Sequence, residues 1–472
     1  MVSEGCDAKV DQLCRDAGRL FRLVNQIAAY VREHQGDRTY APESRAFLEF
    51  IESAAKATKE FLEENIGRLC GNNGPSDGRL PARIAFISQI WGRLHNFVEP
   101  VVDADTLHIP VSLVALLNRQ ARALGLQDQP QIAIELASPL NYLQRKHSPL
   151  RDLAASLENR LSKKVGFPNG LGIIGLPYSQ GPFLFFNCLL FHELGHYYVE
   201  QARLVPEIKN RVSGFIKSLS TSGIPAKNYD PDKLFTITRP WFEEVFCDLF
   251  AVRLLGPAYT FIFADLFDLV GDLRNEKALQ YSRSHPSASI RLKQQIALLR
   301  QPETSGGASS WWEWLATART PLASEIDDVA QKPRAVIPYA RDCEGLPIEL
   351  LDAFESALPQ LSSLVTEKLK GRRLALHRFI ELSSDFERCL LHAIVPRCVI
   401  TRNTSPEDEE WCMSLINASY FLQLGNLKSL FELSGRNSSS VEDHAFLRKR
   451  LEEWVLKAIG DKLAPELLGL IS

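Results

Sequence analysis

The stretch Phe191–Tyr198 has the sequence FHELGHYY and contains the motif H-E-x-x-H. In a helix, residues four apart lie on one face, so His192 and His196 can bind one metal ion through their imidazoles. Glu193 sits one position further round, where a carboxylate can take a proton from a metal-bound water without being a ligand. The other residues are apolar, aromatic or glycine. The stretch therefore predicts a buried helix that carries a zinc site and its catalytic base.

A second stretch, Trp241–Ala251 (WFEEVFCDLFA), supplies acids at helical spacing. Glu244 and Asp248 are four residues apart among apolar side chains, where carboxylates are costly to bury without partners. One carboxylate can complete the three protein ligands of a hydrolytic zinc, while the other accepts the outer N–H of a ligating imidazole. Glu243 is a neighbouring competitor for the ligand role. Only Glu244 is followed by an aspartate at the fourth position, which favours Glu244 as the ligand.

Together, the two stretches resemble those of the gluzincins, zinc peptidases in which H-E-x-x-H is followed by a glutamate on a later helix and an aspartate four residues on. The resemblance covers about residues 165–295, and segment 248–257 is similar to that of small bacterial intracellular members. It implies that Glu193 is the catalytic base and that Asp248 is the outer partner of a ligand histidine. The zinc ligands that it implies are His192, His196 and Glu244.

A third stretch, Ser284–Leu292 (SHPSASIRL), is similar to a segment of membrane-associated zinc peptidases of the Ste and Oma types. Pro286 suits the first turn of a helix, which predicts that His285 stands at the mouth of a cleft. His285 is therefore a candidate catalytic residue that stabilises an oxyanion, and capping or packing is its alternative role. Arg291 could instead bind a carboxylate of the ligand shell or of the substrate.

The composition is that of an ordinary soluble globular protein. The chain has 472 residues, of which 45% are hydrophobic and 24% charged, and its formal net charge is −3. This charge gives no electrostatic case for a nucleic acid partner. No stretch reaches the roughly 18 apolar residues of a membrane span. Nine scattered cysteines without a C-x-x-C pair, together with the absence of an evident signal peptide, predict a cytoplasmic location.

The patterns along the chain predict a mainly α fold with a small β-sheet, an α+β zincin core flanked by N- and C-terminal helical regions. Residues 4–35 show a heptad pattern, which fits an intramolecular bundle better than a partner helix. Segments 131–136 and 172–177 are typical of short strands, and we expect the second to line the cleft as an edge strand that pairs with substrate. Further helices are expected at 43–70, 82–99 and 110–124. The expected regions are residues 1–125 (helical), 126–300 (zincin core) and 311–472 (helical).

These observations predict a zinc metallopeptidase with Zn²⁺ as its cofactor and a peptide or protein as its substrate. Zinc would lower the pKa of its bound water toward about 7, and Glu193 would pass the proton to the leaving amine. The helical regions could bind a protein partner. One alternative is a zinc-binding but catalytically silent scaffold, against which an intact Glu193 argues. Another is a metal-dependent hydrolase of a non-peptide amide, over which only the resemblance favours a peptidase.

Overall fold

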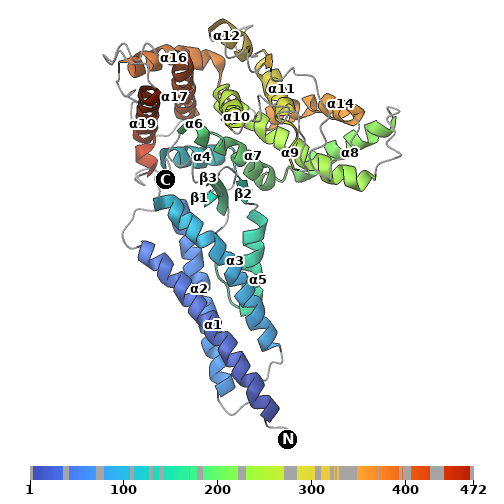
Figure 1. The fold of residues 1–472 in the computed structure, drawn as a ribbon, viewed down its shortest axis with the longest axis vertical. Helices are drawn as coiled ribbons and strands as arrows, with labels where there is room; N and C mark the ends of the chain where they lie inside the picture. The colour runs from blue at the N-terminus through green and yellow to red at the C-terminus, as the bar shows by residue number, and fades with distance from the viewer. Residues whose placement is uncertain are drawn as a thin grey trace. The chain divides into compact units, whose positions relative to one another are not determined.

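The computed structural model is mainly helical with a small three-stranded sheet, which confirms the predicted fold class (Figure 1). The chain divides into two compact units, Met1–Ile109 with Gln127–Gly181, and Pro110–Leu126 with Pro182–Ser472. The structure describes residues 4–35, 42–70, 79–106, 111–126, 131–137, 143–145, 147–168, 171–177, 184–221, 230–269, 284–302, 310–318, 324, 327–328, 348–369, 372–392, 396, 406–425 and 441–467. None of the helices among these residues combines the length and the apolar character that a membrane span requires.

The first unit contains long helices and the sheet. Its helices are α1 (Glu4–Gln35), α2 (Pro42–Cys70), α3 (Leu80–Thr106) and α5 (His147–Leu161). Helix α1 packs against α2 and α3, and α2 and α3 also pack against the sheet. The described core residues of the heptad pattern are buried, namely Leu13, Ala17, Leu20, Val24, Ile27 and Val31. The heptad therefore serves a bundle within the chain, as predicted.

The sheet has the strand order β1-β3-β2. Its strands are β1 (Gln131–Ala137), β2 (Leu143–Arg145) and β3 (Leu171–Pro177). Strand β3 is parallel to β1 and antiparallel to β2, so that Ile174 lies between Ile134 and Gln144. Both predicted strands are confirmed. The prediction that residues 172–177 form an edge strand is wrong, because β3 lies between β1 and β2 and pairs with both.

The second unit is helical in its described residues, and α9 lies at its centre. Its helices are α4 (Val111–Ala123), α6 (Leu184–Asn187), α7 (Leu190–Gln201), α8 (Val205–Thr221), α9 (Pro231–Leu255), α10 (Ala258–Leu269), α11 (Ala288–Leu299), α12 (Trp311–Ala318), α14 (Ile348–Ala357), α15 (Pro359–Lys368), α16 (Leu376–Leu391), α17 (Pro406–Gly425) and α19 (Val441–Leu467). Helices α7, α8, α10, α11 and α15 all pack against α9, and α4 packs against α7 and α19. Elements on both sides of α9 in sequence therefore support it.

Helix α9 ends at Gly256, where the chain turns sharply into α10. Gly256 has a φ of 88°, a conformation that favours glycine, and a Cβ there would lie 2.8 Å from a methyl carbon of Leu374. Asn417 of α17 forms hydrogen bonds with main-chain groups on both sides of this break. Its amide donates a hydrogen bond to the Leu255 carbonyl, and its Oδ1 accepts one from the Ala258 N–H at 2.8 Å. Helix α17 thus fixes the junction between α9 and α10.

The two units do not coincide with the three predicted regions. The strands lie in the unit of the N-terminal helices, whereas α4 belongs to the unit of the C-terminal helices. Buried polar contacts explain the position of α4. Arg119 Nε lies 3.3 Å from Glu409 Oε1 of α17, and Gln120 donates to Glu409 Oε2 at 3.0 Å. Such pairing over nearly 300 residues leaves no local pattern in the sequence, and the predicted regions therefore could not include it.

Candidate metal centre

Helix α7 carries the H-E-x-x-H motif at its contact with α9. The rings of His192 and His196 lie one turn apart, with centroids separated by 4.9 Å. Gly195 lies directly against Cys247 of α9, because a Cβ built on it would lie 3.0 Å from both Cα and Cβ of Cys247. The missing side chain at Gly195 therefore lets α7 approach α9 closely enough for the histidines to meet the acids of α9.

Three side chains converge between these helices. His192 Nε2 lies 3.2 Å from His196 Nε2 and 3.2 Å from Glu244 Oε2, and His196 Nε2 lies 3.3 Å from Glu244 Oε1. Ligand atoms at tetrahedral angles, with bonds of about 2.0–2.1 Å, are separated by about 3.3 Å. The three side chains are 8%, 15% and 10% exposed. His192, His196 and Glu244 therefore form a group that could hold a metal ion.

The chemistry of this group also fits a metal ion. Two imidazole nitrogens and a carboxylate oxygen are ligands for zinc and for other divalent transition metals. Glu244 Oε2 is buried and forms no hydrogen bond within the described residues, although Arg291 Nη2 lies 3.3 Å away. A carboxylate oxygen that is buried without a hydrogen bond lowers the stability of the fold unless a further cation approaches it. Of the two neighbouring glutamates, Glu244 is the one that groups with both histidines.

Replacing Gly195 by alanine is expected to destabilise the protein by about 1–3 kcal/mol, because the new methyl group would meet the backbone of α9. Metal affinity should fall as well, since the histidines and Glu244 lie on the two helices that would separate. Denaturant unfolding and metal titration measure both effects. Gly214→Ala in α8 is the control, because nothing lies within 4 Å of its added methyl. A Gly195→Ala variant as stable as wild type would contradict the close approach.

Asp248 lies behind His192 and is fully buried. Its Oδ1 is 2.9 Å from His192 Nδ1, the ring nitrogen that faces away from the group. Arg291 of α11 contacts the same carboxylate twice, at 2.6 and 2.8 Å, and the Tyr259 hydroxyl of α10 donates to it at 2.9 Å. Burial raises the pKa of Asp248, but the Arg291 guanidinium and His192 together outweigh this effect and hold the pKa at about 2. An ionised Asp248 therefore sits where the sequence predicts an outer partner.

Glu193 is buried beside the group, with 5% exposure, and among the described residues it forms no hydrogen bond or ion pair. Burial raises the pKa of its carboxyl group, while the nearby His192 and His196 lower it less strongly. A carboxyl group with a raised pKa exchanges protons more readily at physiological pH than an exposed one does. Glu193 thus has the environment of an acid–base residue rather than that of a structural ion pair.

His285 precedes α11 and reaches the group from a more exposed side. Its Nε2 lies 3.5 Å from Glu244 Oε1, its side chain is 53% exposed, and its Nδ1 lies 2.7 Å from the Ser284 hydroxyl oxygen. The helix begins later than predicted. Ser287 is its N-cap, so Pro286 precedes the helix instead of occupying the first turn. His285 nevertheless lies close to the group, next to Glu244.

The structure adds roles that the sequence did not assign. Glu243 Oε1 lies 3.2 Å from Nδ1 of His196, which makes Glu243 a neighbour of His196 rather than a member of the group that could hold a metal ion. Tyr259 follows a break in the helix, and no spacing rule connects it with Asp248. For Arg291 the sequence left two roles open, and its contacts place it on the carboxylates of α9.

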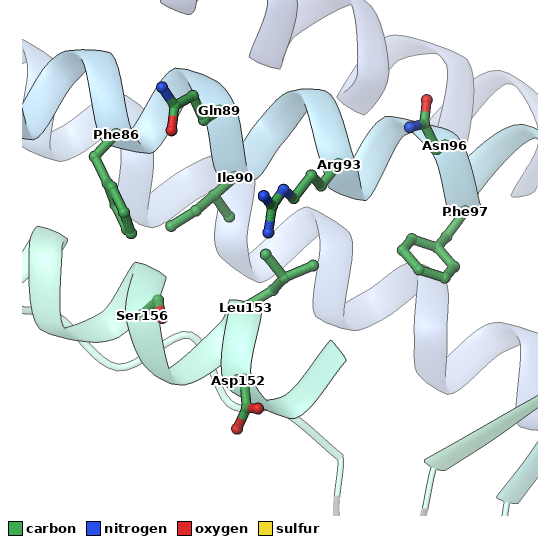
Figure 2. Close-up of a pocket in the computed structure, with 9 residues that line it drawn as sticks. All are labelled: Phe86, Gln89, Ile90, Arg93, Asn96, Phe97, Asp152, Leu153 and Ser156. Carbon is green, nitrogen blue, oxygen red and sulfur yellow. The ribbon is translucent and has the colours of Figure 1, made fainter. Parts of the chain in front are cut away.

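The first unit has a groove of about 500 Å³ between α3 and α5, lined by Phe86, Gln89, Ile90, Arg93, Asn96, Phe97, Asp152, Leu153 and Ser156 (Figure 2). Figure 2 shows the Arg93 guanidinium over Leu153, between the rings of Phe86 and Phe97. This lining has one carboxylate and neither histidine nor cysteine, so it offers no set of metal ligands. The metal group of the second unit is therefore the stronger candidate site.

Comparisons with known proteins found no match to this chain. No protein-family model matches the chain, and no curated protein or solved structure matches it. The relation to the gluzincins therefore stays a prediction from the motifs, and the description of the site depends on its own geometry.

Proposed function

We propose that the protein is a zinc-dependent peptidase that hydrolyses peptide bonds in a peptide or protein substrate. The observation that carries this proposal is the convergence of two imidazole nitrogens and a carboxylate at 3.2–3.3 Å beside the buried carboxylate of Glu193, which is unpaired within the described residues. Structural zinc sites are closed by four protein ligands, whereas hydrolytic sites have three and keep an open position. The metal group among the described residues has three members. This favours a catalytic site over a silent scaffold.

The proposed roles follow from the positions of the side chains. His192, His196 and Glu244 would hold the zinc, which when bound polarises a carbonyl and lowers the pKa of water toward about 7. Glu193 would accept a proton from the attacking water on its carboxylate and deliver it to the nitrogen of the leaving amine. The burial that raises the pKa of Glu193 supports this role. Asp248 would keep His192 oriented through Nδ1.

His285 is proposed to donate a hydrogen bond to the oxyanion that forms when water adds to the substrate carbonyl. The Ser284 hydroxyl can donate to His285 Nδ1, which favours the neutral tautomer with its hydrogen on Nε2. Burial lowers the pKa of His285, and this also favours the neutral ring. Nε2 is the atom that lies 3.5 Å from Glu244, and the exposure of the side chain leaves room for a substrate.

Purified protein is expected to bind about one zinc ion per chain and to cleave casein or a peptide library. Glu193→Gln should keep the zinc and lose at least about 10²-fold of the activity, because only the proton carrier is removed. His196→Ala should lose both. Metal analysis after dialysis and mass spectrometry of the products measure these outcomes. Glu207→Gln on α8 is the control and should keep both properties, and full activity of Glu193→Gln would contradict the proposed base.

A further inference from the structure

Each of the two histidines of the metal group has a carboxylate of α9 beside its Nδ1 atom, and of these two contacts the one of His196 has the geometry of a hydrogen bond. Both rings turn Nε2 toward the group, as the separation of 3.2 Å between these atoms shows. Their Nδ1 atoms point to different acids, His192 to Asp248 at 2.9 Å and His196 to Glu243 at 3.2 Å. A histidine ligand must offer an unprotonated nitrogen, so its ring hydrogen belongs on the other nitrogen, where an acceptor holds it.

We propose that Glu243 is the positioning residue of His196, and this inference rests on the metal site of the proposed function. Glu243 Oε1 accepts the hydrogen of His196 Nδ1, which selects the tautomer and fixes the plane of the ring. Nε2 of His196 is then unprotonated and directed toward His192 and Glu244. Asp248 lies beside Nδ1 of His192 at 2.9 Å, so each histidine has a carboxylate next to its outer ring nitrogen.

The spacing of residues on α9 explains why two acids stand next to each other in its sequence. Residues four apart lie on one face of a helix, so Glu244 lies above Asp248, and Glu243 lies above Cys247. The first pair contacts His192, and Glu243 contacts His196 one turn further along α7. Glu244 also contacts His196, at 3.3 Å, so the two neighbouring glutamates approach the same ring from its two nitrogens.

The position of Glu243 also separates it from the ligands. Its carboxylate lies on the Nδ1 side of the His196 ring, whereas the metal group is on the Nε2 side. One carboxylate cannot accept from Nδ1 and share an ion with Nε2 of the same ring, because the two nitrogens point in different directions. Glu243 therefore acts on the metal through His196 and not as a fourth ligand.

Asp248 and Glu243, the two acids beside the Nδ1 atoms, differ in their surroundings. This difference makes Glu243 the better residue for a test of the positioning role. Asp248 is fully buried and paired with Arg291, so its replacement would disturb both folding and metal binding. Glu243 is 19% exposed, and Arg239 Nη2 lies 4.0 Å from its Oε2. A partly solvated pair of this kind contributes little to stability. Loss of Glu243 should therefore weaken metal binding while the metal-free fold keeps its stability.

The test measures Co²⁺ and Zn²⁺ binding by competition with a chromophoric chelator, together with the visible absorption of the Co²⁺ form. Glu243→Ala should bind both metals about 10–100-fold more weakly than wild type and change the Co²⁺ absorption. Glu243→Gln, whose amide oxygen can still accept from Nδ1, should lie between alanine and wild type. The unfolding midpoint of the metal-free protein should be unchanged in both variants. Glu207→Gln is the matched control and should bind both metals as wild type does.

Each other outcome overturns the inference in a different way. If Glu243→Ala binds metal with wild-type affinity while His196→Ala loses metal, the inference about Glu243 is wrong but the proposed metal site is not. Complete loss of metal in Glu243→Ala, equal to that in His196→Ala, would make Glu243 a ligand. A lowered unfolding midpoint without rescue by glutamine would make it a packing residue. A wild-type protein that binds neither metal overturns this inference and the proposed function together.

Discussion

Replacement of Arg291 by methionine is expected to lower the free energy of unfolding of the metal-free protein by about 3–5 kcal/mol. The guanidinium is 6% exposed, contacts both oxygens of Asp248 and lies 3.3 Å from Glu244 Oε2. Methionine would fill much of the space against the ring of Phe263, over which the guanidinium now lies at 4.7 Å. Two buried carboxylates would then lack their cation. Denaturant unfolding of the metal-free variant measures the loss.

Two further variants show whether charge causes this loss. Arg300→Met removes an arginine at the end of the same helix, where the ion pair with Asp327 is exposed, and it should cost less than about 1 kcal/mol. Adding Asp248→Asn to Arg291→Met should recover part of the stability, because one of the unpaired charges is then removed. If Arg291→Met instead unfolds like wild type and only raises the KM of hydrolysis, Arg291 binds the substrate and not the ligand carboxylates.

The sequence predicts those parts of the site that lie within one helix. The spacing of four residues brings His192 together with His196, and Glu244 together with Asp248, because a helix fixes these neighbours without help from the rest of the fold. The heptad of α1 and the strands at 131–137 and 171–177 were predictable for the same reason, since their periodicity is local. Given these local neighbours, the metal group forms if the helix of His192 and His196 packs against the helix of Glu244.

The contacts that depend on tertiary packing could not be predicted. Arg291 had two plausible partners, and only the approach of α11 to α9 decides between them. The hydroxyl of Tyr259 reaches Asp248 because the chain turns at Gly256. Strand β2 has three residues, too few for a periodic pattern, and it nevertheless occupies the side of β3 that was expected to be free. Sequence spacing carries no information about which elements pack together.

The second unit includes the C-terminal helices, and these helices help to hold the metal group in place. The predicted core, residues 126–300, omits the helices from α12 onward, but several of these support α9 directly. Phe354 of α14 packs against Trp241 and Phe242 of α9, with ring centroids 5.3 Å apart in each case. The N–H of Leu374 donates to the carbonyl of Arg253 at 3.1 Å. The C-terminal helices are therefore part of the body that holds Glu244 in place.

Asn417→Ala tests this dependence and is expected to lower the free energy of unfolding by about 2–4 kcal/mol. The side chain serves the Leu255 carbonyl and the Ala258 N–H, and each buried main-chain group left without a partner costs about 1–3 kcal/mol. Denaturant unfolding measures the loss, and zinc affinity should fall with it, because the junction orients the helices that carry Glu244 and Tyr259.

The matched control is Asn65→Ala in the first unit, where the amide donates, within the described part of the chain, only to the Phe61 carbonyl of its own helix, at 2.7 Å. That variant should lose no more than about 1.5 kcal/mol, the net contribution of one hydrogen bond, and should bind zinc as wild type does. If Asn417→Ala behaves like the control, the junction of α9 and α10 is stable without α17. The metal group would then depend on the helices between residues 184 and 300 alone, as the predicted core assumed.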